Sequence, residues 1–440
     1  MQLKKPVIKA ANPANGPSIR GKLALATCTL LQATGQTAQA ADDWDIQSAL
    51  MIYSESDGRV SAIEPIVAGR KEIGDEEVLN IKLVLDSLTG ATPNGAHASS
   101  DPQTFTNPSG KQSYTVQPGE TPLDDTFLDT RVALSGTWER PIMDERSRII
   151  YGANVSKEFD YMSLGASATF LRDYNNRNTT LSYALGLNSD SIDPSGGVPT
   201  PFANMRVADS GTNRDGSSES KTITDFMFGV TQVISRKTLM QFNLGLSSTS
   251  GYQNDPYKII TVIDPDGTPT SNFPDTDDLP YVYENRPDSR SRQTFYWNTA
   301  HHLTEDVIHL SYRYYTDDWD VNSHTLDFHY RYELSGGAYL QPHIRYYSQS
   351  AAEFFTHSLD YGDPLPEYAS ADYRLGELTT TTLGLKYAMP LARNSEFSVR
   401  AEVINQASKE VGSLVGDQLN QELAPDLDAF IFQVGYSFHW

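Results

Sequence analysis

Histidine, arginine and aspartate residues recur on three successive segments near the end of the chain, where they could bind a metal ion or line an aqueous passage. They are His309, Arg313, Asp327, His329, His343 and Arg345. Imidazole nitrogens suit first-row transition metals, and charged side chains on a pore wall attract or repel ions. Which chemistry applies depends on the elements that carry these residues.

Apolar and polar residues alternate along all three segments, which predicts β-strands with one face in lipid and the other facing a lumen. The six polar side chains then face inward. Antiparallel pairing around turns near Trp319 and Gly336 sets His309 opposite His329 and His329 opposite His343. The sequence therefore predicts a lumenal row of three histidines across neighbouring strands.

Three hypotheses remain for this lumenal cluster. The histidines could share a metal ion, or the residues could simply line the wall, with Asp327 paired to Arg345. A third hypothesis is hydrolysis, because His309-Leu310-Ser311, with Asp327 opposite, resembles the H-x-S element of the outer-membrane phospholipase family. That family's site must face lipid, whereas the alternation turns these residues inward. No catalytic residue, cofactor or metal is therefore assigned.

The same alternation is strongest in the last segment, from Phe430 to Trp440, where every even position is apolar or aromatic. A terminal strand ending in an aromatic residue resembles the assembly signal of bacterial outer-membrane proteins. We assign that role to Tyr436, Phe438 and Trp440, with outer-membrane lipid and the barrel-assembly machinery as the expected partners.

Sixteen such segments can be distinguished, and the connections between them alternate in length. Five long connections, near residues 90–125, 191–219, 252–289, 351–371 and 407–427, all fall on one side if the first strand starts in the periplasm. The turns on the other side are brief and rich in turn-forming residues. The predicted fold is all-β: a transmembrane antiparallel barrel of about sixteen strands, with long outward loops and short periplasmic turns.

Residues 1–40 have the features of a signal peptide, with basic residues, an apolar run from Leu23 to Leu31 and the cleavage motif Ala38-Gln39-Ala40. Residues 41–440 would then form the barrel, located in the outer membrane. The only cysteine, Cys28, falls within the removed segment.

The net charge of the chain indicates which classes of partner to expect. Removing five basic residues with the signal peptide leaves 29 Lys and Arg against 56 Asp and Glu, a net charge of −27. Nucleic acid is therefore excluded as an expected partner, because phosphate binding needs clustered cations. The acidity instead suits divalent cations at the acidic loops, as at Asp264 and Asp266, or a cation-preferring passage.

Three motifs point to a family. Asp129-Thr130-Arg131, the stretch from Tyr314 to Trp319 followed by Ser323-His324-Thr325, and the stretch from Ser370 to Leu375 resemble those of an uncharacterised family of bacterial outer-membrane proteins, domain of unknown function 3570. The resemblance implies the barrel and its location, but no reaction or ligand. Within the hairpin near Trp319, the motif residues are expected to pin the turn by side-chain hydrogen bonds.

The leading functional hypothesis is a channel or transport-related barrel of unknown solute. A surface structural or binding barrel without transport is the second class, and an outer-membrane hydrolase is a distant third.

Overall fold

The computed structural model describes residues 44–73, 76–124, 128–391 and 394–439. The expected signal peptide and Trp440 lie outside these residues. Among the residues described, no helix is long and apolar enough to cross a membrane. The helices in that part of the chain are 3-10 turns: η1 (Ser335–Gly337), η2 (Tyr373–Leu375) and η3 (Gly416–Asn420).

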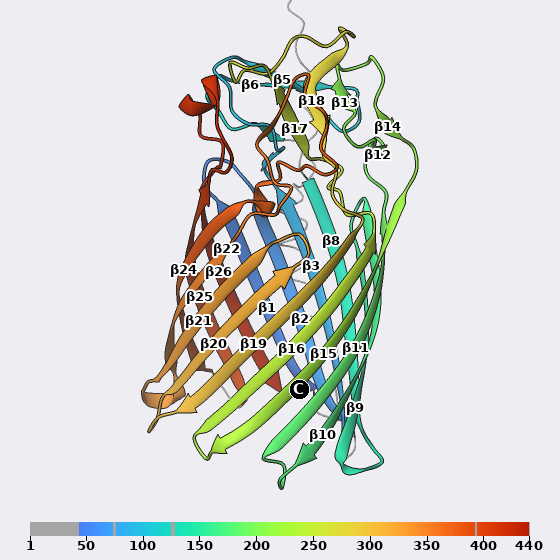
Figure 1. The fold of residues 1–440 in the computed structure, drawn as a ribbon. Helices are drawn as coiled ribbons and strands as arrows, with labels where there is room; N and C mark the ends of the chain where they lie inside the picture. The colour runs from blue at the N-terminus through green and yellow to red at the C-terminus, as the bar shows by residue number, and fades with distance from the viewer. Residues whose placement is uncertain (1–43, 74–75, 125–127, 392–393, 440) are drawn as a thin grey trace, which may run out of the picture. The chain divides into compact units, whose positions relative to one another are not determined.

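Sixteen antiparallel strands form one closed barrel, as predicted (Figure 1). In barrel order the strands are β1 (Trp44–Glu55), β2 (Ser61–Ile73), β3 (Glu77–Thr89), β8 (Leu128–Ile142), β9 (Asp144–Lys157), β10 (Tyr161–Tyr174), β11 (Thr179–Ile192), β15 (Glu219–Ser235), β16 (Thr238–Gly251), β19 (Ser289–His302), β20 (Val307–Asp317), β21 (Asn322–Glu333), β22 (Tyr339–Gln349), β24 (Glu377–Pro390), β25 (Ser395–Lys409) and β26 (Leu427–His439). The last strand pairs with the first, with Phe438 opposite Ile46 and Ala429 opposite Glu55. Closure leaves no free sheet edge in the barrel.

The outward face of the barrel wall is apolar. Leu185 and Leu244, in β11 and β16, are 52% and 53% exposed, although leucine is normally buried in a soluble protein. Asn243, the neighbour of Leu244 in sequence, points to the other face because side chains alternate along a strand. An apolar outer face around a polar interior is the pattern of a barrel that crosses a lipid bilayer.

Connections at the two ends of the barrel differ in length, as predicted. The five long ones span residues 90–127, 193–218, 252–288, 350–376 and 410–426 and all lie at one end, which we call the long-loop end. At the other end, the connection between β8 and β9 is the single residue Met143, and that between β15 and β16 is residues 236–237.

The long connections fold together into a structure that we call the cap, defined as residues 90–124, 193–218, 252–288, 350–376 and 410–426. Figure 1 shows its strands gathered at the long-loop end. Four small sheets form it: β4 (Thr92–Pro93) with β7 (Leu123–Asp124), β5 (Gln103–Thr106) with β6 (Ser113–Val116), β12 (Val198–Pro199) with β14 (Arg214–Asp215), and β13 (Asn204–Arg206), β18 (Asp278–Tyr283), β17 (Ile259–Ile263) and β23 (Ser358–Asp360) in that order.

The cap has its own hydrophobic core, which the sequence did not predict. Phe105 and Ile260 are fully buried, in clusters that draw residues from up to three long connections. All five residues of β17 are buried, and its neighbours β18 and β23 come from different parts of the chain. The segments bury one another only when the loops pack together. The sequence of a single loop therefore does not reveal this core.

The hairpin between β20 and β21 is pinned as expected from its motif. Asp317 Oδ1 accepts hydrogen bonds from the backbone N–H groups of Trp319 and Val321, each at 3.0 Å. The indole of Trp319 donates to the carbonyl of Ser289 at 3.0 Å, and its ring packs in a cluster with Val321 and Leu375. The motif thus joins the tip of the hairpin to β19 and to the cap.

Candidate functional site: a charged lumen beneath a folded cap

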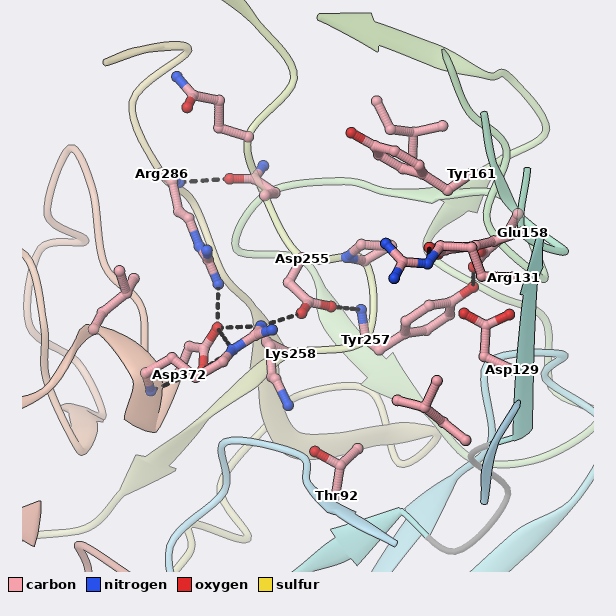
Figure 2. A pocket seen from close by; sticks show the side chains of 18 of the residues that line it. Thr92, Asp129, Arg131, Glu158, Tyr161, Asp255, Tyr257, Lys258, Arg286 and Asp372 are labelled. Atoms are coloured by element: carbon pink, nitrogen blue, oxygen red, sulfur yellow. Dashed lines mark hydrogen bonds and ion pairs between the residues drawn. The ribbon is translucent and has the colours of Figure 1, made fainter. Parts of the chain in front are cut away.

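A cavity of about 1300 Å³ lies at the long-loop end and is bounded by both the barrel wall and the cap. Arg313, Thr325 and Arg345 line it from the wall, while Asp255 and Asp372 line it from the cap. Figure 2 shows Arg286 and Asp372 of the cap on one side of this cavity and Arg131 and Tyr161, of β8 and β10, on the other. Its volume exceeds the ~300 to 1000 Å³ of typical ligand pockets, and its lining includes charged side chains from both the wall and the cap.

On the cap side, a network of charges built around Arg286 and the buried residues Glu284 and Asp372 joins two of the long connections. Arg286 contacts Glu284 at 2.7 Å and Asp372 at 2.8 Å, and Arg374 contacts Asp372 and Asp255, each at 2.5 Å. Burial disfavours the ionised carboxyl of Asp372, but Arg374 and Arg286 outweigh it and hold its pKa well below the usual range. This network therefore fixes residues 252–288 against residues 350–376.

Opposite sides of the cavity wall carry opposite charge. In a ring of sixteen strands, those eight places apart face each other, so β3 faces β20 and β8 faces β21. Glu64 of β2 and Asp129 of β8 lie on one side, with Arg313 of β20 and Arg345 of β22 on the other. None of these four forms a salt bridge with any residue that the structure describes, although Asp129 shares a hydrogen bond with Glu158 and Glu64 lies in the field of Arg131.

The strand pairing predicted for the lumenal cluster is the pairing observed. His309 lies opposite His329 and Ser311 opposite Asp327; His329 lies opposite His343. Asp327 is also opposite Arg345, but its carboxylate contacts His329 and His343 instead. Arg313 stacks over the ring of Tyr296, 5.8 Å from its centroid.

The lumenal cluster contains one residue that the sequence did not single out, Glu402 of β25. Its Oε1 lies 3.0 Å from Nδ1 of His343, although β24 separates their strands. Gly384 of β24 stands between them in register, opposite both His343 and Glu402. A Cβ at this position would lie 2.7 Å from Cγ of Glu402, so the contact depends on the missing side chain. In the sequence, Gly384 between Leu383 and Leu385 was the feature that could have indicated a gap in the lumenal wall at this place.

The residues of the hydrolase hypothesis come together only in part. Ser311 and Asp327 are opposite each other, but within the described chain no hydrogen bond joins Ser311 to His309 or to Asp327. The arrangement therefore adds no support to a nucleophile and its base.

The proposed assembly residues lie at the end of β26. The rings of Tyr436 and Phe438 stack with their centroids 5.4 Å apart, and Phe438 pairs with both Ile46 and Ser395. Trp440 lies outside the described residues. These contacts place the aromatic pair beside the closing seam, while its role in assembly stays a prediction.

The acidic loop residues suggested for divalent cations have partners within the protein. Asp264 accepts hydrogen bonds from Thr270 and Asn272, and Asp266 from Thr268. The later carboxylates Asp275, Asp277 and Asp278 contact Arg206, at 3.1 to 3.5 Å. Cation binding at these loops stays a prediction, and these contacts would compete with it.

A buried histidine of the cap, His357, is expected to make the cap sensitive to acid. His357 Nε2 accepts the backbone N–H of Val411 at 3.2 Å, which only the neutral ring can do. Burial, with a smaller effect of His97, lowers the pKa of His357 to about 4. Because the pKa is about 6.5 in an unfolded chain, the stabilisation is complete above pH ~6.5 and is lost as the pH falls toward 4, by about 3 kcal/mol.

We therefore expect hydrogen exchange in residues 350–376, corrected for intrinsic pH dependence, to accelerate between pH 7 and pH 4.5. His357→Gln keeps an acceptor for Val411 and cannot take up the proton, so it should flatten this response. His302→Gln, at an exposed site, serves as the matched control. An unchanged pH response in His357→Gln would assign the acid sensitivity to other groups.

Comparison with known proteins identifies the family of the chain. A search of curated proteins gave no match. Among solved structures, a bacterial polysaccharide outer membrane secretin aligns over 91% of this chain and 100% of its own, with 7% identity and a TM-score of 0.42. The outer membrane protein opdK from Pseudomonas aeruginosa aligns over 91% and 99%, with 10% identity and a TM-score of 0.38.

The siderophore receptor PirA from Acinetobacter baumannii aligns over 85% of this chain but 54% of its own, with 10% identity and a TM-score of 0.41. At such scores the similarities support no inference about function. The sequence profile of the family described as "Protein of unknown function (DUF3570)" matches residues 20–438, so the chain belongs to that family.

Proposed function

We propose that this protein is an outer-membrane channel for small charged solutes, which pass through the cavity between the cap and the barrel wall. The observation that carries the proposal is the cavity itself, about 1300 Å³, lined by charged side chains from the wall and the cap. The closed wall with its apolar outer face supports placement in a membrane.

The opposed charges suggest which solutes are favoured. Arg313 and Arg345 face a side of the lumen that carries Glu64 and Asp129, so a solute with both a positive and a negative group can satisfy both walls. Charges on the walls of a narrow, water-filled passage act over about a Debye length of 8 to 10 Å. Arg313 and Arg345 therefore attract anions locally, although the net charge of the whole chain is negative.

Conductance in planar lipid bilayers tests the proposal. We expect purified full-length protein to form channels, and the double variant Arg313→Gln/Arg345→Gln to shift permeability toward potassium over chloride, by about 2- to 10-fold. Glu64→Gln removes one charge from the opposite side and should shift it the other way. Glu64→Gln preserves side-chain size, whereas Arg→Gln shortens each side chain but keeps it polar.

Absence of conductance from correctly folded protein would contradict the channel and favour a binding barrel without transport. Equal selectivity in all three proteins would show that the cavity does not lie on the conducting path.

A further inference from the structure

We propose that Asp327, His329 and His343 form a binding site for a divalent transition-metal ion of the zinc class on the lumenal wall, with Glu402 holding His343 in place. The site is independent of transport, because it can bind an ion whether or not the barrel conducts.

The potential ligand atoms already lie close together. Nε2 of His329 is 2.9 Å from one carboxylate oxygen of Asp327, and Nε2 of His343 is 3.0 Å from the other. Within the described chain these three residues supply a group of ligand atoms that all lie within 4.8 Å of one another. A zinc ion bound at ~2.0 to 2.1 Å to nitrogen and oxygen spaces its ligands at comparable distances.

The two imidazoles share one orientation. Their rings are stacked, with centroids 4.0 Å apart and planes 11° from parallel, and both point Nε2 at the same carboxylate. A carboxylate can only accept, so each Nε2 carries a hydrogen in this arrangement. An ion would replace those hydrogens, and the rings would tilt toward it by rotation about their side-chain bonds.

Glu402 supplies the feature that separates this group from a chance cluster of polar residues. In metal-binding histidines the N–H of the second ring nitrogen usually donates a hydrogen bond, often to a carboxylate, which fixes the tautomer and the ring orientation. Nδ1 of His343 lies 3.0 Å from Oε1 of Glu402, whose side chain is only 6% exposed. The gap at Gly384 admits this contact across β24.

The donor set also selects the ion. Two imidazoles and one carboxylate suit zinc, copper or nickel better than calcium or magnesium, which prefer oxygen ligands alone. Three protein ligands leave one coordination position open, and the side chain of His329 is still 29% exposed. The ion would therefore be reachable by a ligand in the lumen.

Zinc itself is the probe for the first experiment. Full-length barrel in detergent is stripped with chelator, titrated with Zn²⁺ by calorimetry and assayed for bound metal after desalting. We expect one Zn²⁺ per chain, with proton release on binding. His329→Gln and His343→Gln should each weaken binding at least ~100-fold, since each removes a ligand.

His309→Gln is the matched control. His309 lies opposite His329 on the next strand and also faces the lumen, but it is not among the three grouped ligands. It should retain wild-type affinity. Heat-modifiable migration checks the fold of each variant, and the more exposed His329 provides the test if His343→Gln fails to fold.

Glu402→Gln tests the positioning residue. We expect it to weaken zinc binding by about 10- to 100-fold while keeping one ion per chain. With Co²⁺ as a second probe, the visible spectrum of Glu402→Gln should differ from wild type, because the orientation of His343 changes; a purely structural role would leave the spectrum unchanged.

Three results would overturn the proposal. They are no stoichiometric zinc in the folded wild type, unchanged affinity in folded His329→Gln, and a loss in His309→Gln as large as in His329→Gln. The first two would leave an ion-paired wall cluster, and the third would point to nonspecific binding by lumenal imidazoles.

Discussion

Replacing Arg286 with Met is expected to destabilise the cap by about 3 to 5 kcal/mol while leaving the barrel closed. The side chain is 10% exposed, and its carboxylate partners Glu284 and Asp372 are each 1% exposed. Removing the cation leaves two buried carboxylates with one fewer counter-charge in a poorly hydrated site. Limited proteolysis of the reconstituted protein would measure the effect as faster cleavage within residues 252–288 and 350–376.

Arg206→Met provides a control with the same substitution in the same cap. Arg206 pairs with Asp275 and Asp277, whose side chains are 50% and 49% exposed, and with Asp278, which is 19% exposed. Exposed ion pairs contribute only about 0 to 1 kcal/mol each, so the loss should be smaller than in Arg286→Met, whose partners are both buried. Equal cleavage of the two variants would show that the buried network does not hold the loops together.

Deleting Phe438 to Trp440 is expected to prevent accumulation of the barrel in the outer membrane, leaving the chain to periplasmic proteases. The deletion removes the outward aromatic end of β26 together with its pairing to Ile46 and Ser395. Membrane fractionation and heat-modifiable migration measure the outcome.

A pair of substitutions separates the aromatic signal from simple loss of pairing. Tyr436→Ser/Phe438→Ser changes the lipid-facing residues, whereas Ser437→Ala/His439→Ala changes the intervening ones and preserves chain length. The first should be lost from the membrane and the second retained. Normal levels of folded barrel in the first variant would contradict the assembly role.

The barrel could be predicted because each strand carries its own signal. Alternation with a period of two identifies a strand and its inward residues, and short turns fix the pairing of neighbours. The row His309, His329 and His343 was therefore placed in register from the sequence. All three lie on consecutive strands joined by short connections.

The cap could not be predicted in the same way. Phe105, Met205 and Tyr281 meet in one core although they come from three different loops. Pairing of β17 with β23 joins residues about a hundred positions apart. Such contacts leave no periodic pattern in any one loop, so the sequence did not indicate a shared core.

The candidate site shows the same limit. Glu402 reaches His343 across an intervening strand, through a gap made by Gly384, and neither the distance nor the gap follows from alternation. The net charge does not show how charge is distributed in the lumen, because many carboxylates pair locally while Arg313 and Arg345 face the cavity without ion pairs to described residues. A cation-preferring passage stays a prediction.

The shared core of the cap also decides where foreign sequence can be displayed on this protein. Loops that pack on one another cannot change length independently. An epitope inserted near Gly196 would push apart two packed segments of the cap, because a Cβ at Gly196 would already lie 1.9 Å from the carbonyl oxygen of Pro108. At Gly211 a Cβ would meet nothing within 4 Å. Within the connection of residues 193–218, a displayed peptide should therefore be accepted at Gly211 and rejected near Gly196.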